Sequence, residues 1–386
     1  MKKRLLFYCQ HILGMGHLVR SMEIVRGLLP EFQVCFINGG EVVKGFEIPP
    51  EVEVVNLPAI KTDAEFRTLQ PVDKSLDLAT VQAMRTQTLL ALGDLFAPDI
   101  LMVELFPFGR RKFSFELIPL LEQAKSRQTQ VVCSLRDIVV TKQDLAKHEA
   151  KVCKLMNQYF DLLLVHGDRN FQSLEETFSR ISDLRCETHY TGYVVQPQPE
   201  TLIPLPAIAP LILASIGGGR FGHELLYGLL EAAPILAQQT PHRIQIFTGP
   251  FMPEETFDEL EAIAQALPTV SIDRFTPHLL SYMKQADLSI SMSGYNTTMN
   301  ILTTGVRAML LPFTGNDDQE QTLRSQKLAR LGVVEVLAQE DLQGDRFAQK
   351  ILRCLQTEQA PVQFDFNGVQ NTTALLRDLA VKSKAA

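Results

Sequence analysis

Short apolar runs alternate with longer segments of helical periodicity along almost the whole of this 386-residue sequence. Most runs are apolar at consecutive positions, which is typical of strands buried on both faces of a parallel sheet. The first half predicts a doubly wound α/β domain, because each expected strand is followed by a helix or a loop long enough to cross the sheet. The expected strands are 4–9, 33–38, 99–104, 130–135 and 161–166, and the expected helices are 17–29, 77–95, 114–126 and 141–157.

A proline-rich stretch at 194–210 interrupts this alternation, since its prolines cannot continue a helix or a central strand. The pattern then restarts with strands expected at 210–216, 243–249, 269–273, 287–292, 308–313 and 333–337. The matching helices are expected at 221–238, 254–266, 278–285, 296–304, 319–331 and 367–381. We therefore predict an N-terminal domain at 1–195, a linker at 196–209, a C-terminal domain at 210–365 and a C-terminal helix at 366–386.

Composition narrows the class of protein. The sequence is 46% hydrophobic and 21% charged, as in globular proteins, and its net charge of -7 argues against a nucleic-acid partner. Six scattered cysteines form no CxxC pair, so we expect buried thiols in a reducing cytoplasm and no zinc site. No apolar run approaches the ~18 residues of a membrane span. HxxxH and DxD triplets are also absent, and we expect no metal site.

Glycine-rich turns follow the first strand of each predicted domain, as GMGH at 14–17 and GGGRFG at 217–222. Such turns let backbone N–H groups and a helix N-terminus approach a phosphate. The strand after the second turn ends in Thr-Gly-Pro and has no acidic residue, which disfavours a nicotinamide cofactor and leaves a pyrophosphate open. A third segment, SMSGYNTT at 291–298, ends a strand and opens a helix. A tight turn or a simple cap without a ligand is the alternative at each place.

His17 begins the first predicted helix, where the helix dipole favours the neutral imidazole that a general base needs; a polar cap is the alternative. Segment ELFPFGRRKFSFEL (104–117) interleaves phenylalanines with cations after a strand end. It is suited to an anionic acceptor or a membrane surface, or else to a loop whose rings pack beneath it. Glu104 and Arg136 also end strands. The lone histidines His11, His166 and His223 are interpreted as structural.

Together, the GxGH turn, the glycine loop of the second domain and SGYNTT followed by LPF, DDQEQ and ARLG resemble GT-B glycosyltransferases. The likeness is to family 28, which contains the N-acetylglucosaminyltransferase of peptidoglycan lipid II synthesis. It implies two Rossmann-like domains that face each other across a cleft. The C-terminal domain would hold a nucleotide-sugar, usually a UDP-sugar, and the N-terminal domain the acceptor.

The resemblance also implies roles for particular residues. Asn300 stands where the family often has a glutamate at the ribose. His17 would be the base of an inverting transfer. The residues implied to bind the donor are Gly217, Gly218, Gly219, Arg220, Phe275, Thr276, Ser293, Gly294, Asn296, Thr297, Asn300, Glu320 and Gln321. Those expected on the acceptor side are Gly14, Gly16, Arg20, Glu104, Arg110, Arg111 and Arg136.

The implied activity is a metal-independent hexosyl transfer from UDP-GlcNAc or another UDP-hexose, without a cofactor, to an unidentified small-molecule or lipid-linked acceptor. The expected location is cytoplasmic, and a weak peripheral contact with the inner membrane face through 105–115 stays open. Two alternatives remain. GxGHxxR is also similar to a UDP-sugar hydrolase of pseudaminic acid synthesis, in which water replaces the acceptor, and a non-catalytic nucleotide-sugar-binding subunit is the other.

Overall fold

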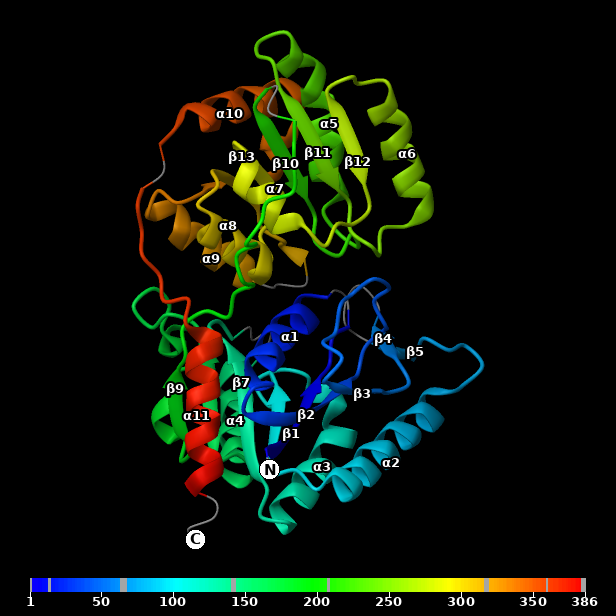
Figure 1. Ribbon diagram of the computed structural model, residues 1–386, viewed down its shortest axis with the longest axis vertical. Coiled ribbons are helices and arrows are strands. Elements are labelled where there is room, and N and C mark those ends of the chain that lie inside the picture. Colours follow the sequence, from blue (N-terminus) through cyan, green and yellow to red (C-terminus); the bar gives the residue numbers. More distant parts are fainter. Residues whose placement is uncertain are drawn as a thin grey trace. The chain divides into compact units, whose positions relative to one another are not determined.

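A computed structural model describes residues 2–12, 15–62, 68–139, 144–206, 209–315, 319–358 and 360–382. The chain divides into two compact units (Figure 1). The first contains Met1–Leu13, His17–Val195 and Phe364–Ala386, and the second contains Gly14–Gly16 and Gln196–Gln363. The first residues of the helix expected at 141–157 lie outside the described residues.

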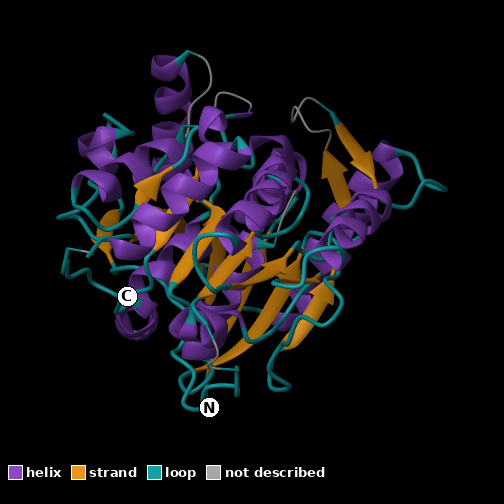
Figure 2. Ribbon diagram, turned by 90° about the horizontal axis from the view of Figure 1, so that it is seen from above, coloured by secondary structure: helices purple, strands orange, loops and turns teal. Residues whose placement is uncertain are grey.

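The first unit is built on a parallel sheet in the order β3-β2-β1-β6-β7-β8-β9. Strands β1, β6, β7 and β8 are almost wholly buried, as their continuous apolar runs predict. Figure 2 shows the strands with helices beside them. The strands are β1 (Lys3–Cys9), β2 (Phe32–Asn38), β3 (Glu53–Asn56), β6 (Ile100–Glu104), β7 (Gln130–Arg136), β8 (Leu162–His166) and β9 (Glu187–Tyr190). The helices are α1 (Gly16–Leu28), α2 (Leu78–Phe96), α3 (Ser114–Ser126), α4 (Leu145–Tyr159) and α11 (Gly368–Lys382).

The C-terminal helix α11 packs on the first unit, although the chain reaches it from the second. Asn371 donates its side-chain amide to the Thr191 carbonyl at 2.9 Å, and the Thr373 hydroxyl donates to the Gly27 carbonyl at the end of α1. The returning chain is fixed just before the helix, where the Tyr193 backbone N–H donates to the Asp365 carbonyl at 2.7 Å. These contacts make α11 part of the first unit's fold.

The second unit has a parallel sheet in the order β12-β11-β10-β13-β14-β15. Its strands are β10 (Leu211–Ser215), β11 (Arg243–Phe247), β12 (Val270–Asp273), β13 (Leu288–Met292), β14 (Ala308–Leu311) and β15 (Glu335–Val336). Its helices are α5 (His223–Ala237), α6 (Glu254–Gln265), α7 (Leu279–Gln285), α8 (Tyr295–Thr304), α9 (Glu320–Arg330) and α10 (Gly344–Gln356). The two parallel sheets confirm the predicted α/β class.

The strand order reverses once in each sheet. In the first unit the chain runs outward from β1 to β2 and β3, and from β6 through β7 and β8 to β9, so the reversal lies between β1 and β6. In the second unit it lies between β10 and β13. Ligands of open α/β sheets bind outside the carboxyl ends of the strands at such a reversal. A ligand site is therefore expected at the loops after β1, β6, β10 and β13.

Some elements were not predicted from the sequence. They are β3, β9, helix α10 and the antiparallel pair β4 (Ile60–Thr62) and β5 (Leu69–Pro71). Strands β3 and β9 are partly exposed sheet edges, so they lack the continuous apolar run used to recognise strands. Helix α10 does carry an amphipathic pattern, with Phe347, Ile351 and Cys354 buried, and that pattern was missed.

Candidate active site

His17 and Glu104 form a hydrogen-bonded pair at the reversal point of the first unit. His17 is the second residue of α1, and Glu104 is the last residue of β6. His17 Nδ1 lies 2.7 Å from Glu104 Oε1. An ionised carboxylate only accepts hydrogen bonds, so Nδ1 carries the proton and Nε2 keeps its lone pair. The arrangement is that of a base and the group that orients it.

Burial and charge keep this pair in the form that a base requires. Burial lowers the pKa of His17 to about 3, although Glu104 opposes the change, so the imidazole is neutral near pH 7. Burial works to raise the pKa of Glu104, but His17, Arg20 and Arg110 outweigh it and hold that pKa well below its usual range. The His17 side chain is 17% exposed, whereas Glu104 is fully buried.

Arg20 and Glu104 do not fit the acceptor-contact role predicted for them. Arg20 is buried on α1 and donates from Nη2 to the same Glu104 oxygen that His17 contacts. Glu104 has no exposed surface with which to meet an acceptor. Both residues contribute to the site through His17. Glu104 hydrogen-bonds to its Nδ1, and Arg20 neutralises the Glu104 carboxylate. The sequence pattern identified the residues but not their depth.

The other predicted acceptor-side residues lie in different surroundings. Gly16 begins α1, and Gly14 lies outside the described residues. Arg110 is half-buried and donates from Nε to the Gln10 carbonyl at 2.8 Å. Arg111 is exposed. Arg136, at the end of β7, lowers the pKa of His17, as Arg110 does.

The phenylalanines of 104–117 pack inward. Phe106, Phe108 and Phe113 belong to the core of the first unit, and Phe115 packs against it. Phe108 also meets the Phe178 ring edge-on, with the centroids 5.0 Å apart. Three of the four rings therefore offer no surface to a membrane, and Phe115 is partly buried. No helix in the described part of the chain is long and apolar enough to cross one.

Arg85 on α2 organises the loops around this site and was not singled out from the sequence. It is fully buried, donates to both Glu116 oxygens at 2.7 Å, and reaches the carbonyls of Gly39 and Pro58 at 2.9 Å. A further bond joins it to Gln10 Oε1 at 2.6 Å. One guanidinium thus ties together the loops that follow β1, β2 and β3. A lone arginine in a helical segment gives no sequence signal for this role.

The neighbouring histidines are structural, as predicted. His166 is fully buried between the hydroxyls of Ser134 and Thr191, at 2.8 and 2.9 Å from its two ring nitrogens. His11 contacts Asn38 Oδ1 at 2.9 Å and is buried. Burial lowers the pKa of both residues, that of His166 to about 3.

In the second unit, the predicted glycine loop follows β10 and interlocks with the loop after β11. Gly219 has φ +88°, and a Cβ there would lie 2.5 Å from the Thr248 carbonyl oxygen. Gly249 is equally confined, since its Cβ would lie 2.4 Å from the Gly217 carbonyl oxygen. The Phe251 N–H donates to the Gly218 carbonyl at 2.9 Å and joins the two loops. The close fit of two backbones explains why glycines are needed here.

Other predicted donor residues surround this loop. The Arg220 guanidinium stacks over the Phe251 ring, 4.7 Å from its centroid. His223, the first residue of α5, contacts the Gly219 carbonyl at 2.8 Å through Nε2. Phe275, after β12, leaves 38% of its surface exposed. The Thr276 hydroxyl accepts from the His278 N–H at 3.1 Å.

The predicted segment at the end of β13 is only partly exposed. Gly294 is the N-cap residue of α8. Because it has no side chain, it gives the first N–H groups of that helix no side-chain acceptor. Asn296 and Thr297 are partly exposed in its first turn. Ser293 is fully buried and hydrogen-bonds to the Ser325 hydroxyl of α9. Its hydroxyl is therefore turned into the fold, contrary to the predicted phosphate contact.

Asn300, Glu320 and Gln321 make internal contacts at the positions predicted to hold ribose or sugar. Asn300 is buried and donates to Gln196 Oε1 at 3.2 Å. Glu320 is buried and accepts from Arg324 at 3.0 Å, whereas Gln321 Oε1 accepts from the Phe313 N–H at 3.0 Å. Asn300 and Gln321 thus join α8 and α9 to neighbouring segments, whereas the Glu320–Arg324 pair lies within α9. The sequence identified the segment but not the direction of its side chains.

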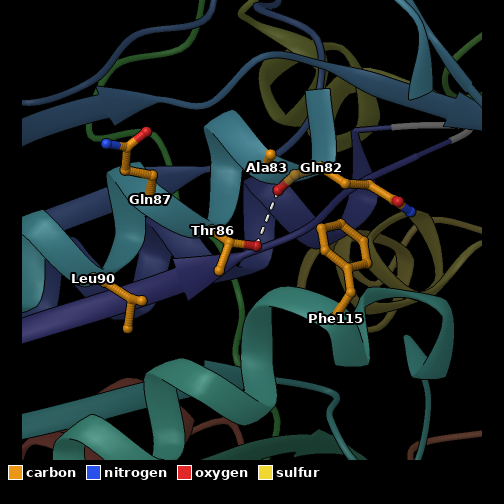
Figure 3. A pocket seen from close by; sticks show the side chains of 6 residues that line it. All are labelled: Gln82, Ala83, Thr86, Gln87, Leu90 and Phe115. Carbon is orange, nitrogen blue, oxygen red and sulfur yellow. Dashed lines mark hydrogen bonds between the residues drawn. The ribbon is translucent and has the colours of Figure 1, made fainter. Parts of the chain in front are cut away.

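The described residues contain no candidate metal-ligand cluster, and a surface hollow of the first unit carries no catalytic group. Across the described ranges, no three His, Cys, Asp or Glu side chains are grouped so that they could hold a metal ion. An open hollow of about 480 Å³ lies between α2 and α3 (Figure 3) and has no titratable side chain in its lining. Its lining residues are Gln82, Ala83, Thr86, Gln87, Leu90 and Phe115.

Known proteins are similar in sequence to parts of this chain. Residues 215–371 match the model of the glycosyltransferase family 28 C-terminal domain. A protein of Prochlorococcus marinus (strain NATL1A) is 25% identical over 195 residues, 50% of this chain and 52% of its own length. It is named UDP-N-acetylglucosamine--N-acetylmuramyl-(pentapeptide) pyrophosphoryl-undecaprenol N-acetylglucosamine transferase. The chain thus spans about half the length of this relative.

Solved structures match over nearly the full length. Acinetobacter baumannii MurG has a TM-score of 0.57 at 16% identity, covering 98% of this chain and 100% of its own. A putative UDP-N-acetylglucosamine 2-epimerase from Listeria monocytogenes has a TM-score of 0.64 at 12% identity, covering 100% and 98%.

The two parallel sheets and these structural matches define a protein of the GT-B fold. Within that fold, residues 215–371 match the glycosyltransferase family 28 C-terminal domain, and the sequence relatives are named as glycosyltransferases, which supports the predicted resemblance. The structural match to an epimerase shows that the fold alone does not fix the reaction.

Proposed function

We propose that this protein transfers a hexose from a UDP-sugar to an acceptor hydroxyl, with inversion at the anomeric carbon and His17 as the general base. The observation that carries the proposal is the His17–Glu104 pair at the reversal point of the first unit. The family 28 domain at 215–371 supports the nucleotide-sugar donor. The name of the Prochlorococcus relative makes UDP-N-acetylglucosamine the first donor to test.

On the acceptor side, His17 Nε2 takes the hydroxyl proton while the acceptor oxygen attacks C1 of the sugar. The bond between C1 and the β-phosphate oxygen breaks, and UDP leaves with the electron pair. Glu104 stays ionised and stabilises the imidazolium that forms. Because its pKa is held low, the Glu104 carboxylate does not take the proton itself. The acceptor hydroxyl, His17 and Glu104 thus serve as nucleophile, base and orienting group, as in other enzymes that activate a hydroxyl with a neighbouring base.

On the donor side, the leaving diphosphate would be bound by backbone N–H groups at the starts of α5 and α8. Their N-cap residues, Gly222 and Gly294, make no side-chain capping bond. Helix N-termini favour negative charge, and glycines allow a close approach. The exposed Phe275 ring is suited to stack on the uracil. This scheme uses neither an organic cofactor nor a metal ion.

The acceptor is either a small molecule or a lipid-linked compound; the relative's name points to one on pyrophosphoryl-undecaprenol. The proposed location is the cytoplasm, where the six cysteines, all free thiols, would stay reduced. If the acceptor is lipid-linked, the protein would also make a peripheral contact with the inner membrane face. It would have to use the cations of 105–115, because three of the aromatic rings there are buried.

The test measures donor binding and turnover separately. In a thermal-shift panel of UDP, GDP, dTDP and their sugars, a donor at 100 times its dissociation constant adds about 2.7 kcal/mol of stability. We expect UDP-sugars to stabilise the wild type and His17→Ala equally, while His17→Ala loses about 10²- to 10⁴-fold in turnover. Unchanged turnover in His17→Ala would remove the base. Failure of every nucleotide-sugar to stabilise the protein would remove the donor.

The same assays separate transfer from hydrolysis. UDP release is measured with and without a panel of hydroxyl acceptors. A transferase releases UDP faster when its acceptor is present and forms a glycosylated product in equal amount. Equal UDP release with and without acceptors, and free sugar as the only product, would point to the hydrolase.

A further inference from the structure

Arg110 lies in the loop that follows β6, near enough to His17 for its charge to lower the pKa of that imidazole. Its backbone has φ +56°, a left-handed conformation that costs a non-glycine residue about 1–2 kcal/mol. Phe108 and Phe113 are buried on either side of it and anchor the loop in the core. Its Nε–H donates to the Gln10 carbonyl in the loop after β1, at 2.8 Å. The guanidinium is thus fixed between the two loops that meet at the reversal point.

Among the residues that the structure describes, none donates to, accepts from or pairs with the terminal nitrogens of Arg110. In the described part of the chain, the bond to Gln10 is the only hydrogen bond of this side chain, and no carboxylate lies within 4 Å of it. Glu104, the nearby carboxylate, is already shared by His17 and Arg20. Burial lowers the pKa of the half-buried Arg110, and the nearby Arg136 adds to the decrease.

This situation differs from that of the other inward-facing arginines of the unit. Arg20 and Arg85 each contact a buried carboxylate. A partly buried charge that lacks a partner is costly, and proteins normally pair it. A guanidinium presents two parallel N–H donors that match a carboxylate or a phosphate. The geometry therefore calls for an anion from outside the chain.

We propose that Arg110 binds an anionic group of the acceptor, a carboxylate or a phosphate, through Nη1 and Nη2, beside the hydroxyl that His17 deprotonates. The proposal rests on the proposed transfer for the role of the ligand, but the anion site itself does not depend on it. Arg136 adds positive charge at the end of the neighbouring strand β7. Acceptors without an anionic group near the reacting hydroxyl would bind more weakly.

The first test measures anion binding without any donor. The probes are inorganic phosphate and lactate, and the readout is the chemical shift of the His17 ring in histidine-labelled protein, assigned with His17→Asn. We expect at least one probe to shift this signal saturably in wild type. Arg110→Gln should weaken that binding at least tenfold, and Arg110→Lys less so. Arg127→Gln removes the same charge from an exposed position outside this loop and should bind as wild type does.

Two results of this titration would overturn the anion site. One is the absence of a saturable shift with either probe, and the other is equal binding by Arg110→Gln and wild type. A shift with phosphate alone, or with lactate alone, supports the site and identifies which anionic group the acceptor carries.

The second test uses turnover with UDP-N-acetylglucosamine and three acceptor classes: sugar phosphates, uronic acids and neutral sugars. We expect transfer to a charged class, with KM for that acceptor raised at least tenfold in Arg110→Gln and kcat changed little. Use of neutral sugars by wild type as efficiently as charged acceptors, or an unchanged KM for the charged class in Arg110→Gln, refutes the anion site and, with His17 still required, leaves the transfer intact. Absence of any donor binding refutes the transfer, and the titration still decides the anion site.

Discussion

Replacing Glu104 by glutamine tests whether the pair with His17 serves the chemistry or only the fold. The carboxylate is fully buried and is shared by His17 and by Arg20, which is itself 2% exposed. Removing one partner of a buried ion pair costs about 3–5 kcal/mol. The change also puts an amide against His17 Nδ1, so the imidazole no longer has a partner that fixes its tautomer. In Ser-His-Asp enzymes the matching change lowers kcat about 10⁴-fold.

Stability and turnover are separated with a second variant. Glu104→Leu combined with Arg20→Met removes both charges, and apolar replacement of a buried pair is often neutral or stabilising by about 1–4 kcal/mol. We therefore expect Glu104→Gln to lose both stability and turnover, and the double variant to regain stability while it stays inactive. Urea unfolding followed by circular dichroism gives the free energy, and UDP release gives the turnover.

Two outcomes would refute this reasoning. Recovery of turnover along with stability in the double variant would mean that Glu104 is a structural residue only. Wild-type turnover in Glu104→Gln would mean that His17 needs no orienting carboxylate.

Three further predictions concern the donor loop, the loop scaffold and pH. Gly219→Ala should weaken UDP-sugar binding in the thermal-shift assay and destabilise the chain by about 1–3 kcal/mol, because its Cβ meets backbone; Gly305→Ala, which shares the positive φ (+69°) but has nothing within 4 Å of its Cβ, is the matched control. Arg85→Ala should cost about 3–5 kcal/mol in urea unfolding, whereas the exposed Arg127→Ala should cost at most about 1 kcal/mol; equal losses would contradict the scaffold role. The pKa of His17 is lowered to about 3 from an ordinary 6.5, so the unfolded chain binds more protons between these values and stability falls as pH drops through that window. His17→Asn should fall less steeply, and the wild-type kcat/KM should show no ionisation of His17 near pH 6.5.

The alternation of apolar runs with helical segments was enough to predict most of the fold. Strands such as β6 and β8 are buried on both faces, so every position must be apolar, and that constraint is local to the sequence. The glycine loop at 217–222 was also predictable, because backbones that approach closely leave no room for a Cβ. Edge strand β9 carries no such constraint and was missed.

Only the tertiary structure decided which polar residues face a ligand and which face the interior. Glu104, Ser293 and Glu320 lie in the segments that the sequence pointed to, yet all are buried and paired inside their units. A strand end or a helix start places a residue near the edge of a sheet, whereas its depth depends on what packs over it. Arg85 and the helix α11 show the same limit, since their partners are distant in the sequence. Periodicity therefore determined the sheets and the location of the site, while long-range packing determined which side chains are available for chemistry.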